Sequence, residues 1–191
     1  SRYLVRLPNG EIIDCVLKGK IRLDGRKTTN PVAVGDVVDV ESDENGDYVI
    51  ANIHPRKNYI IRKSINLSKQ AQILASNLDQ AMLVVTLVAP RTSLGFIDRF
   101  LITAEAYSIP AILVFNKSDV LDDELLALQQ EIISIYENAG YKCIVVSSLK
   151  NRNVEEVKTL LKDKTTLISG HSGVGKSTLI NAIEPGLDLK T

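Results

Sequence analysis

Residues 170–177 read Gly170-His171-Ser172-Gly173-Val174-Gly175-Lys176-Ser177 and fit the pattern GxxxxGK followed by Ser or Thr. An apolar run at residues 165–168 precedes them, and a helical pattern at residues 178–183 follows, up to Pro185-Gly186. A strand, a glycine-rich loop and a helix in this order aim backbone N–H groups and a helix N-terminus at one point, which suits a phosphate group. The stretch predicts an α/β fold with a phosphate-binding loop.

Two side chains of this loop are expected to act in catalysis. Lys176 is expected to bridge the β- and γ-phosphates of a nucleotide, and the Ser177 hydroxyl to ligate Mg²⁺. The whole segment 170–178, which ends at Thr178, is expected to bind the nucleotide. His171 is expected at an exposed position of the loop, with a nucleotide or partner contact as the alternative. The competing interpretation of the segment is a glycine-rich turn before an ordinary helix.

From about residue 80, the chain alternates apolar runs with helical patterns. The apolar runs lie at residues 82–88, 111–115, 142–146 and 165–168. Their near-continuous apolar character is typical of parallel strands that are buried on both faces. Apolar residues recur at spacings of three and four in residues 96–104 and 125–136. This order predicts a doubly wound α/β domain with right-handed crossovers.

The segment Asn116-Lys117-Ser118-Asp119 follows the predicted strand at residues 111–115, at the sheet edge where ligands bind. The Asp119 carboxylate can accept hydrogen bonds from N1–H and the 2-amino group of guanine, and adenine has neither donor there. Asn116 is expected to tie this loop to the phosphate loop, and the stem of Lys117 to cover one face of the base. The alternative is an Asx turn before a helix that starts near Asp122.

A third segment, Ser147-Ser148-Leu149-Lys150, also follows a predicted strand. It resembles the Ser-Ala-Lys element of GTPases, whose middle backbone N–H donates to guanine O6. Leu149 stands where Ala is usual, which is tolerable because the contact uses only the backbone. Alone the segment is a weak signal, but three such segments at strand ends strongly indicate a guanine-nucleotide site.

The three segments occur in an unusual order. In ordinary GTPases the phosphate loop comes first, whereas here it starts at residue 170, after the segments at residues 116 and 147. This order indicates a circular permutation. A circular permutation opens the chain at a new position and joins the former termini. It is physically allowed because the termini of compact domains often lie close together.

Residues 1–66 have a different pattern, with short β-branched or aromatic runs between turn sequences. The runs lie at residues 3–5, 12–17, 37–40 and 48–50, and Asn9-Gly10 and Asn45-Gly46 are hairpin signals. About five strands in this length favour a small barrel of the SH3 or OB kind, and we expect an OB-fold. We expect two domains, residues 1–66 and 67–191, with a polar connector at residues 64–79.

Composition excludes several classes of protein. Lys+Arg and Asp+Glu each number 23, which excludes a uniformly basic nucleic-acid coat. Residues 1–70 nevertheless hold 12 basic and 9 acidic residues, and residues 71–191 hold 11 and 14. Cys15 and Cys143 are too few and too far apart for a disulfide scaffold or a zinc site. The longest apolar run is about half of a bilayer span, so we expect a cytoplasmic protein without membrane contact.

A barrel followed by this permuted set of motifs resembles the ribosome-small-subunit-dependent GTPase A family. Residues 30–38 resemble the family's barrel, and residues 77–80 resemble its approach to the G domain. The resemblance implies a GTP-hydrolysing, Mg²⁺-dependent factor, activated by the small ribosomal subunit and acting in its late maturation. It also implies a barrel that contacts ribosomal RNA, and we expect a monomer.

Eleven basic residues lie in the first third of the chain, and such a cluster favours contacts with RNA phosphates. The alternative is a solvated surface of mixed charge. His54, beside Pro55, is expected to be a surface histidine without a catalytic role. The basic residues are Arg2, Arg6, Lys18, Lys20, Arg22, Arg26, Lys27, Arg56, Lys57, Arg62 and Lys63.

The sequence departs from the family's pattern after Gly170. It lacks the family's switch threonine segment, its DxxG element and its Cys/His zinc domain, so we expect a truncated chain, without zinc, that hydrolyses GTP weakly. Two alternatives stay open. One is a non-catalytic RNA-binding module that senses guanine nucleotides, and the other is a permuted GTPase that acts on another ribonucleoprotein.

Overall fold

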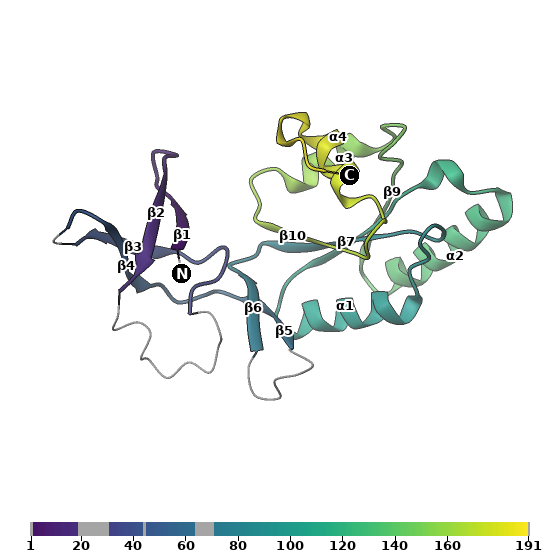
Figure 1. Ribbon diagram of the computed structural model, residues 1–191. Coiled ribbons are helices and arrows are strands. Elements are labelled where there is room, and N and C mark those ends of the chain that lie inside the picture. Colours follow the sequence, from purple (N-terminus) through teal and green to yellow (C-terminus); the bar gives the residue numbers. More distant parts are fainter. Residues whose placement is uncertain (1, 19–30, 44, 64–70, 191) are drawn as a thin grey trace. The chain divides into compact units, whose positions relative to one another are not determined.

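The computed structural model describes residues 2–18, 31–43, 45–63 and 71–190, which form two compact units, Ser1–Asn77 and Leu78–Thr191 (Figure 1). The side chains at positions 62, 63, 71 and 72 are also outside the description. Of the basic residues expected to contact RNA, four lie outside the described residues: Lys20, Arg22, Arg26 and Lys27.

The first unit is all-β. Its larger sheet has the strand order β1 (Arg2–Arg6), β2 (Ile12–Leu17), β4 (Tyr48–Ile53) and β3 (Val38–Ser42). The outer pairs are antiparallel, and β2 pairs with β4 in parallel. Because alternate side chains of a strand point to opposite faces, one face of this sheet carries a common core. The buried members of that core are Ile13, Cys15, Leu17 and Ile50.

The prediction of a polar connector at residues 64–79 is wrong in part, because a strand lies within this segment. β6 (Ala71–Ser76) pairs antiparallel with β5 (Tyr59–Lys63). Ile73 and Ala75 are buried, whereas Leu74 between them is 41% exposed. This alternation is the signal of a strand with one buried face, and polar neighbours obscure it in the sequence.

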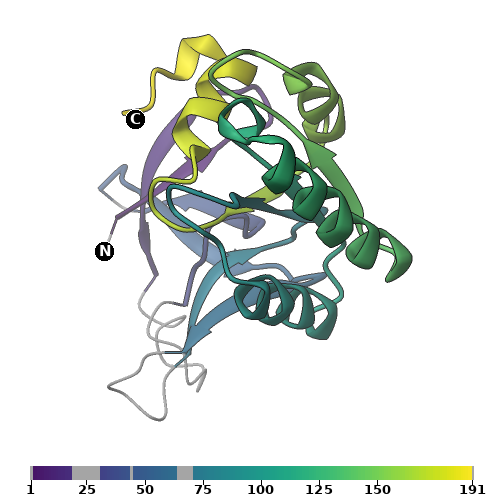
Figure 2. The same cartoon turned by 90° about the vertical axis from the view of Figure 1, so that its right-hand side faces the viewer.

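The second unit is a four-stranded parallel sheet between two layers of helices. The strand order is β10 (Thr166–Ser169), β7 (Gln80–Val85), β8 (Ala111–Phe115) and β9 (Lys142–Val145). Figures 1 and 2 show α1 (Leu94–Ala106) and α2 (Asp123–Asn138) on one face, and α3 (Val154–Leu161) and α4 (Lys176–Ile183) on the other. Two short 3-10 turns, Ser118–Val120 and Pro185–Leu187, complete the unit.

Each face of this sheet has its own apolar core, because successive residues of β7 point in opposite directions. Met82 and Val84 pack with α3 and α4, and Leu83 and Val85 pack with α1 and α2. The all-β first unit and the mostly parallel second unit confirm the expected fold class.

Two elements of the second unit differ from expectation. β7 ends at Val85 rather than at residue 88, because the backbone turns at Thr86, whose N–H and carbonyl both bond to Thr92. The helix α3 is absent from the sequence-based prediction. Its apolar residues, Val154, Val157, Leu160 and Leu161, follow a helical spacing, but they cover only eight residues, which is short for a clear helical period.

The last strand of the unit lies beside the first. β10 pairs with β7 through four parallel residue pairs, from Thr166–Gln80 to Ser169–Leu83. The strand that leads into the phosphate loop therefore lies next to the first strand of the unit, at an edge of the described sheet, although it comes last in the chain. Sheet topology and motif order agree on a permuted connection.

Candidate nucleotide-binding site

The phosphate loop runs from the end of β10 to the start of α4. Gly170, Gly173 and Gly175 all have positive φ, a conformation that favours glycine. A Cβ on Gly170 would collide with the Val84 carbonyl oxygen, and one on Gly175 would collide with the side-chain amide of Asn116. Only glycine at positions 170 and 175 therefore allows the loop to follow this path. The path ends at Gly175, directly before the N-terminus of α4.

Lys176 lies across the loop that precedes it. Its Nζ donates hydrogen bonds to the carbonyl oxygens of Gly170, at 2.8 Å, and His171, at 2.7 Å. These contacts hold a positive charge at the mouth of the loop. Ser177 follows in the first turn of α4, half-buried, and among the described residues no side-chain hydrogen bond engages its hydroxyl. That oxygen and the glycine-lined cradle suit a Mg²⁺-bound nucleotide.

Asn116 joins all three predicted segments. Its Nδ2 donates to the Val174 carbonyl of the phosphate loop at 2.9 Å. Its Oδ1 accepts from the N–H of Ser148, at 3.1 Å, and from the Ser148 hydroxyl, at 2.9 Å. Asn116 and Ser148 are both buried. Because one rigid amide connects two loops from distant parts of the sequence, the loops are held in a fixed relation.

Asp119 is held in its ionised form. Ser147 Oγ donates to Asp119 Oδ1 at 2.5 Å, and this bond is the main reason that the pKa of Asp119 is below its usual range. Desolvation opposes the shift, whereas the nearby charges of Lys150 and Arg152 support it. Among the described residues, no second side chain donates to this carboxylate, so it retains acceptor capacity for a ligand.

The remaining residues of the two base-side segments have distinct positions. Lys117 has a positive φ of 62°, and its Nζ donates to the Ala89 carbonyl at 2.5 Å. Ser118 is buried, and its hydroxyl is without a hydrogen-bond partner among the described residues. Leu149 is 76% exposed at the tip of its loop, and the N–H of Lys150 donates to Ser147 Oγ at 3.1 Å.

His171 is exposed and also packs against a neighbouring ring. Its imidazole centroid lies 4.0 Å from that of Phe96, which belongs to α1. Two residues near the site, Ala89 and Pro90, follow the expected strand at residues 82–88 and carry no sequence pattern that marks their contacts with the motifs. Phe96 is expected from the sequence only as an apolar residue of a helix, and its contact with His171 is not.

Several basic residues of the first unit form ion pairs with carboxylates of the same unit. Arg56 forms a bidentate ion pair with Asp36, with side chains only 11% and 1% exposed. Arg2 pairs with Asp14, and Lys18 with Glu41, at exposed positions. Arg56 is therefore a structural residue, and only the exposed basic residues keep their charge available to a polyanion.

The described residues contain no cluster of His, Cys, Asp and Glu that could hold a metal, and Cys15 and Cys143 are free thiols. Nor does the described part of the chain include a helix long and apolar enough to cross a membrane.

The comparison with known families agrees with this geometry. A model of the RsgA GTPase family matches residues 53–191. The chain belongs to the RsgA GTPase family. The resemblance that the three motifs carry is thereby confirmed.

Curated relatives match over the whole of this chain. It is 54% identical to the small ribosomal subunit biogenesis GTPase RsgA of Flavobacterium johnsoniae and 52% identical to that of Bacteroides fragilis. The chain covers 60% and 62% of these two relatives, so it spans less than two thirds of their length.

Two solved structures have the same fold. YjeQ from Thermotoga maritima superposes with a TM-score of 0.80 at 38% identity, over 99% of this chain and 63% of that one. YloQ, described as a circularly permuted GTPase, superposes with a TM-score of 0.69 at 30% identity, over 97% and 61%.

Proposed function

We propose that this chain carries the guanine-nucleotide site of a GTPase that matures the small ribosomal subunit in the cytoplasm. The observation that carries the proposal is the pair of contacts made by Asn116, which join the phosphate loop to Ser148 on the base side. Relatives named for small-subunit biogenesis support the biological role.

In this proposal, each segment has one task. Lys176 and the loop's N–H groups bind the β- and γ-phosphates, and Asp119 and the Leu149 N–H read the guanine edge. Ser177 is the residue that would hold Mg²⁺, which supplies positive charge to the phosphate oxygens during phosphoryl transfer. The first unit would contact ribosomal RNA through its exposed basic residues, and the protein would act as a monomer.

The chain is expected to bind GTP and GDP but to turn GTP over slowly. No DxxG sequence follows Gly170 in these 191 residues, so the element that places the attacking water is not part of this chain. Binding without rapid hydrolysis would also fit a nucleotide-sensing module, which the assay below separates from a GTPase.

The test measures nucleotide affinity and GTP hydrolysis, each with and without purified small ribosomal subunits. We expect micromolar or tighter GDP binding, no comparable ATP binding, and slow turnover by this chain. A chain extended to the full length of the curated relatives is expected to hydrolyse GTP faster when subunits are added. Equal ATP and GTP affinity would overturn the assigned base site, and an extended chain that subunits do not stimulate would overturn the ribosomal role.

A further inference from the structure

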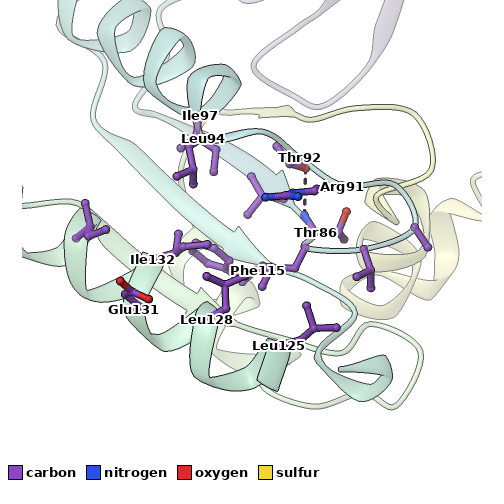
Figure 3. Close-up of a pocket in the computed structure, with 15 residues that line it drawn as sticks. Thr86, Arg91, Thr92, Leu94, Ile97, Phe115, Leu125, Leu128, Glu131 and Ile132 are labelled. Atoms are coloured by element: carbon purple, nitrogen blue, oxygen red, sulfur yellow. Dashed lines mark hydrogen bonds between the residues drawn. The ribbon is translucent and has the colours of Figure 1, made fainter. Parts of the chain in front are cut away.

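A second cavity lies in the α/β unit, apart from the nucleotide-binding segments. It has a volume of about 490 Å³ and lies between the loop at residues 86–92, α1 and α2 (Figure 3). None of the residues at positions 116–119, 147–150 or 170–178 lines it. Its volume falls within the range of small-molecule sites, roughly 300–1,000 Å³.

The cavity has a buried apolar floor and an exposed apolar mouth. Val85, Ile97 and Phe115 are at most 2% exposed, and they give the floor a fixed shape. Leu94 and Ile135 at the mouth are 45% and 56% exposed. A ligand with an apolar body would remove this surface from water, which stabilises a complex by about 25 cal/mol per Å².

Two charged side chains specify the polar end of such a ligand. Arg91 comes from the loop wall and Glu131 from α2, and Figure 3 shows them on different sides of the cavity. Among the residues that the structure describes, neither has an ion-pair partner. An anionic group is attracted to the Arg91 guanidinium and repelled by the Glu131 carboxylate, so the two charges favour a single orientation of an amphipathic anion.

The loop at residues 86–92 lies between this cavity and the nucleotide site. It is internally bonded, because Thr86 accepts from the Thr92 N–H at 2.8 Å and donates its hydroxyl to the Pro90 carbonyl at 2.5 Å. On its other side, the Ala89 carbonyl accepts from Lys117, and Pro90 lies within van der Waals reach of a Cβ at Gly173. The loop at residues 86–92 therefore lies against both the segment at residues 116–119 and the phosphate loop.

We propose that this cavity is a second ligand site, which binds a small amphipathic anion with its apolar body inside and its anionic group on Arg91. Occupancy changes the rate of guanine-nucleotide release through residues 86–92. The ligand site stands on the cavity itself, whereas the effect on release rests on the proposed nucleotide binding.

The test uses decanoate as the probe, below its micellar concentration, with ¹³C-methyl NMR of the 191-residue chain. We expect saturable shifts at Ile97, Ile132 and Ile135, and no comparable shifts at Ile144 or Ile183, which pack on the opposite face of the sheet. Release of a fluorescent GDP analogue, measured in parallel, is expected to change at least threefold at saturating decanoate.

Matched variants separate the site from general surface binding. Arg91→Glu is expected to weaken decanoate binding at least tenfold, and Leu128→Trp to block it by filling the mouth. Arg99→Glu and Ile102→Trp make the same changes on exposed parts of α1 outside the cavity, and are expected to leave binding unchanged. Shifts on both faces of the sheet, or Arg91→Glu binding like the parent, would overturn the site.

The two parts of the proposal fail separately. Decanoate binding with an unchanged release rate would overturn the coupling. A chain that binds decanoate but no guanine nucleotide would overturn the proposed function, and the coupling with it, while the methyl shifts would still support the ligand site.

Discussion

Asp36 in the first unit and Asp119 in the second are both carboxylates with lowered pKa, yet their surroundings differ. Asp36 accepts four hydrogen bonds, two from Arg56 at 2.6 Å and one each from Ala33 N–H and the Ser76 hydroxyl. Asp119 accepts one side-chain bond, from Ser147. The first carboxylate is saturated within the fold, whereas the second keeps capacity for a ligand.

The comparison shows that a perturbed pKa alone does not mark a binding residue. For Asp36, burial by itself would raise the pKa, but the bonds from Arg56, Ala33 and Ser76 outweigh it and hold the pKa low. For Asp119, the hydrogen bond from Ser147 comes first among the causes. The number of unused acceptor positions distinguishes the carboxylate that is saturated within the fold, Asp36, from the one that can still accept from a ligand, Asp119.

Asp36→Asn should have the largest effect, on stability. It leaves the largely buried Arg56 guanidinium, 11% exposed, without its counter-charge, and we expect a loss of about 3 kcal/mol in the free energy of unfolding. Denaturant titration followed by circular dichroism measures it. Asp14→Asn, which breaks an exposed ion pair with Arg2, is the control and should cost less than about 1 kcal/mol. Equal losses in the two variants would contradict a structural role for Asp36.

Asp119→Asn should leave stability nearly unchanged and shift nucleotide preference. We expect guanine-nucleotide affinity to fall on the order of 100-fold, since the amide cannot accept from both guanine donors, and xanthine-nucleotide affinity to rise. Calorimetric titration with GDP and XDP measures both. Asp122→Asn is the control, because Asp122 caps α2 through Leu125 N–H and asparagine caps equally well. Unchanged GDP affinity would remove Asp119 from the base site.

Each of the two carboxylates accepts a hydrogen bond from one serine, and removing that serine tests whether the two carboxylates have different roles. Ser147→Ala takes away the side-chain donor of Asp119, and we expect GDP affinity to fall about tenfold, since the carboxylate loses its fixed orientation. Ser76→Ala leaves three donors on Asp36, and we expect a stability loss of about 1 kcal/mol without any effect on GDP binding. A loss of GDP affinity in Ser76→Ala would break the distinction between the two regions.

The smallest expected effect is on acid stability. Because the pKa of Asp36 is lower in the folded chain than its ordinary value of 3.8, its ionised form stabilises the fold above that pH. This stabilisation is lost as pH falls through the folded pKa. Unfolding titrations between pH 7 and pH 2 should therefore show a shallower acid dependence for Asp36→Asn than for the parent. Parallel curves would show that the carboxyl titrates normally.

Much of the site could be predicted from sequence because its chemistry is local. The spacing of Gly170, Gly175, Lys176 and Ser177 is that of a phosphate-binding loop pattern, and Asn116 to Asp119 follow a guanine-reading pattern. The order of the motifs was also enough to indicate a permuted sheet. Patterns of period two and near-continuous apolar runs predicted an all-β unit followed by an α/β unit.

The contacts between distant segments could not be predicted in this way. Nothing in the sequence shows that Arg56 belongs to Asp36 rather than to a polyanion, because their pairing depends on two turns brought together by folding. The end of β7 at Val85 depends on Thr92, and the 490 Å³ cavity depends on how α1 and α2 pack beside that turn.

The sequence by itself determined the fold class, the guanine-nucleotide motifs and the family, because these depend on short-range spacing and periodicity. Only the tertiary structure decided which charges are neutralised, which carboxylate remains open to a ligand and where a second cavity forms. The physical reason is that burial, ion pairing and cavity shape depend on side chains far apart in the chain, whose distances exist only after folding.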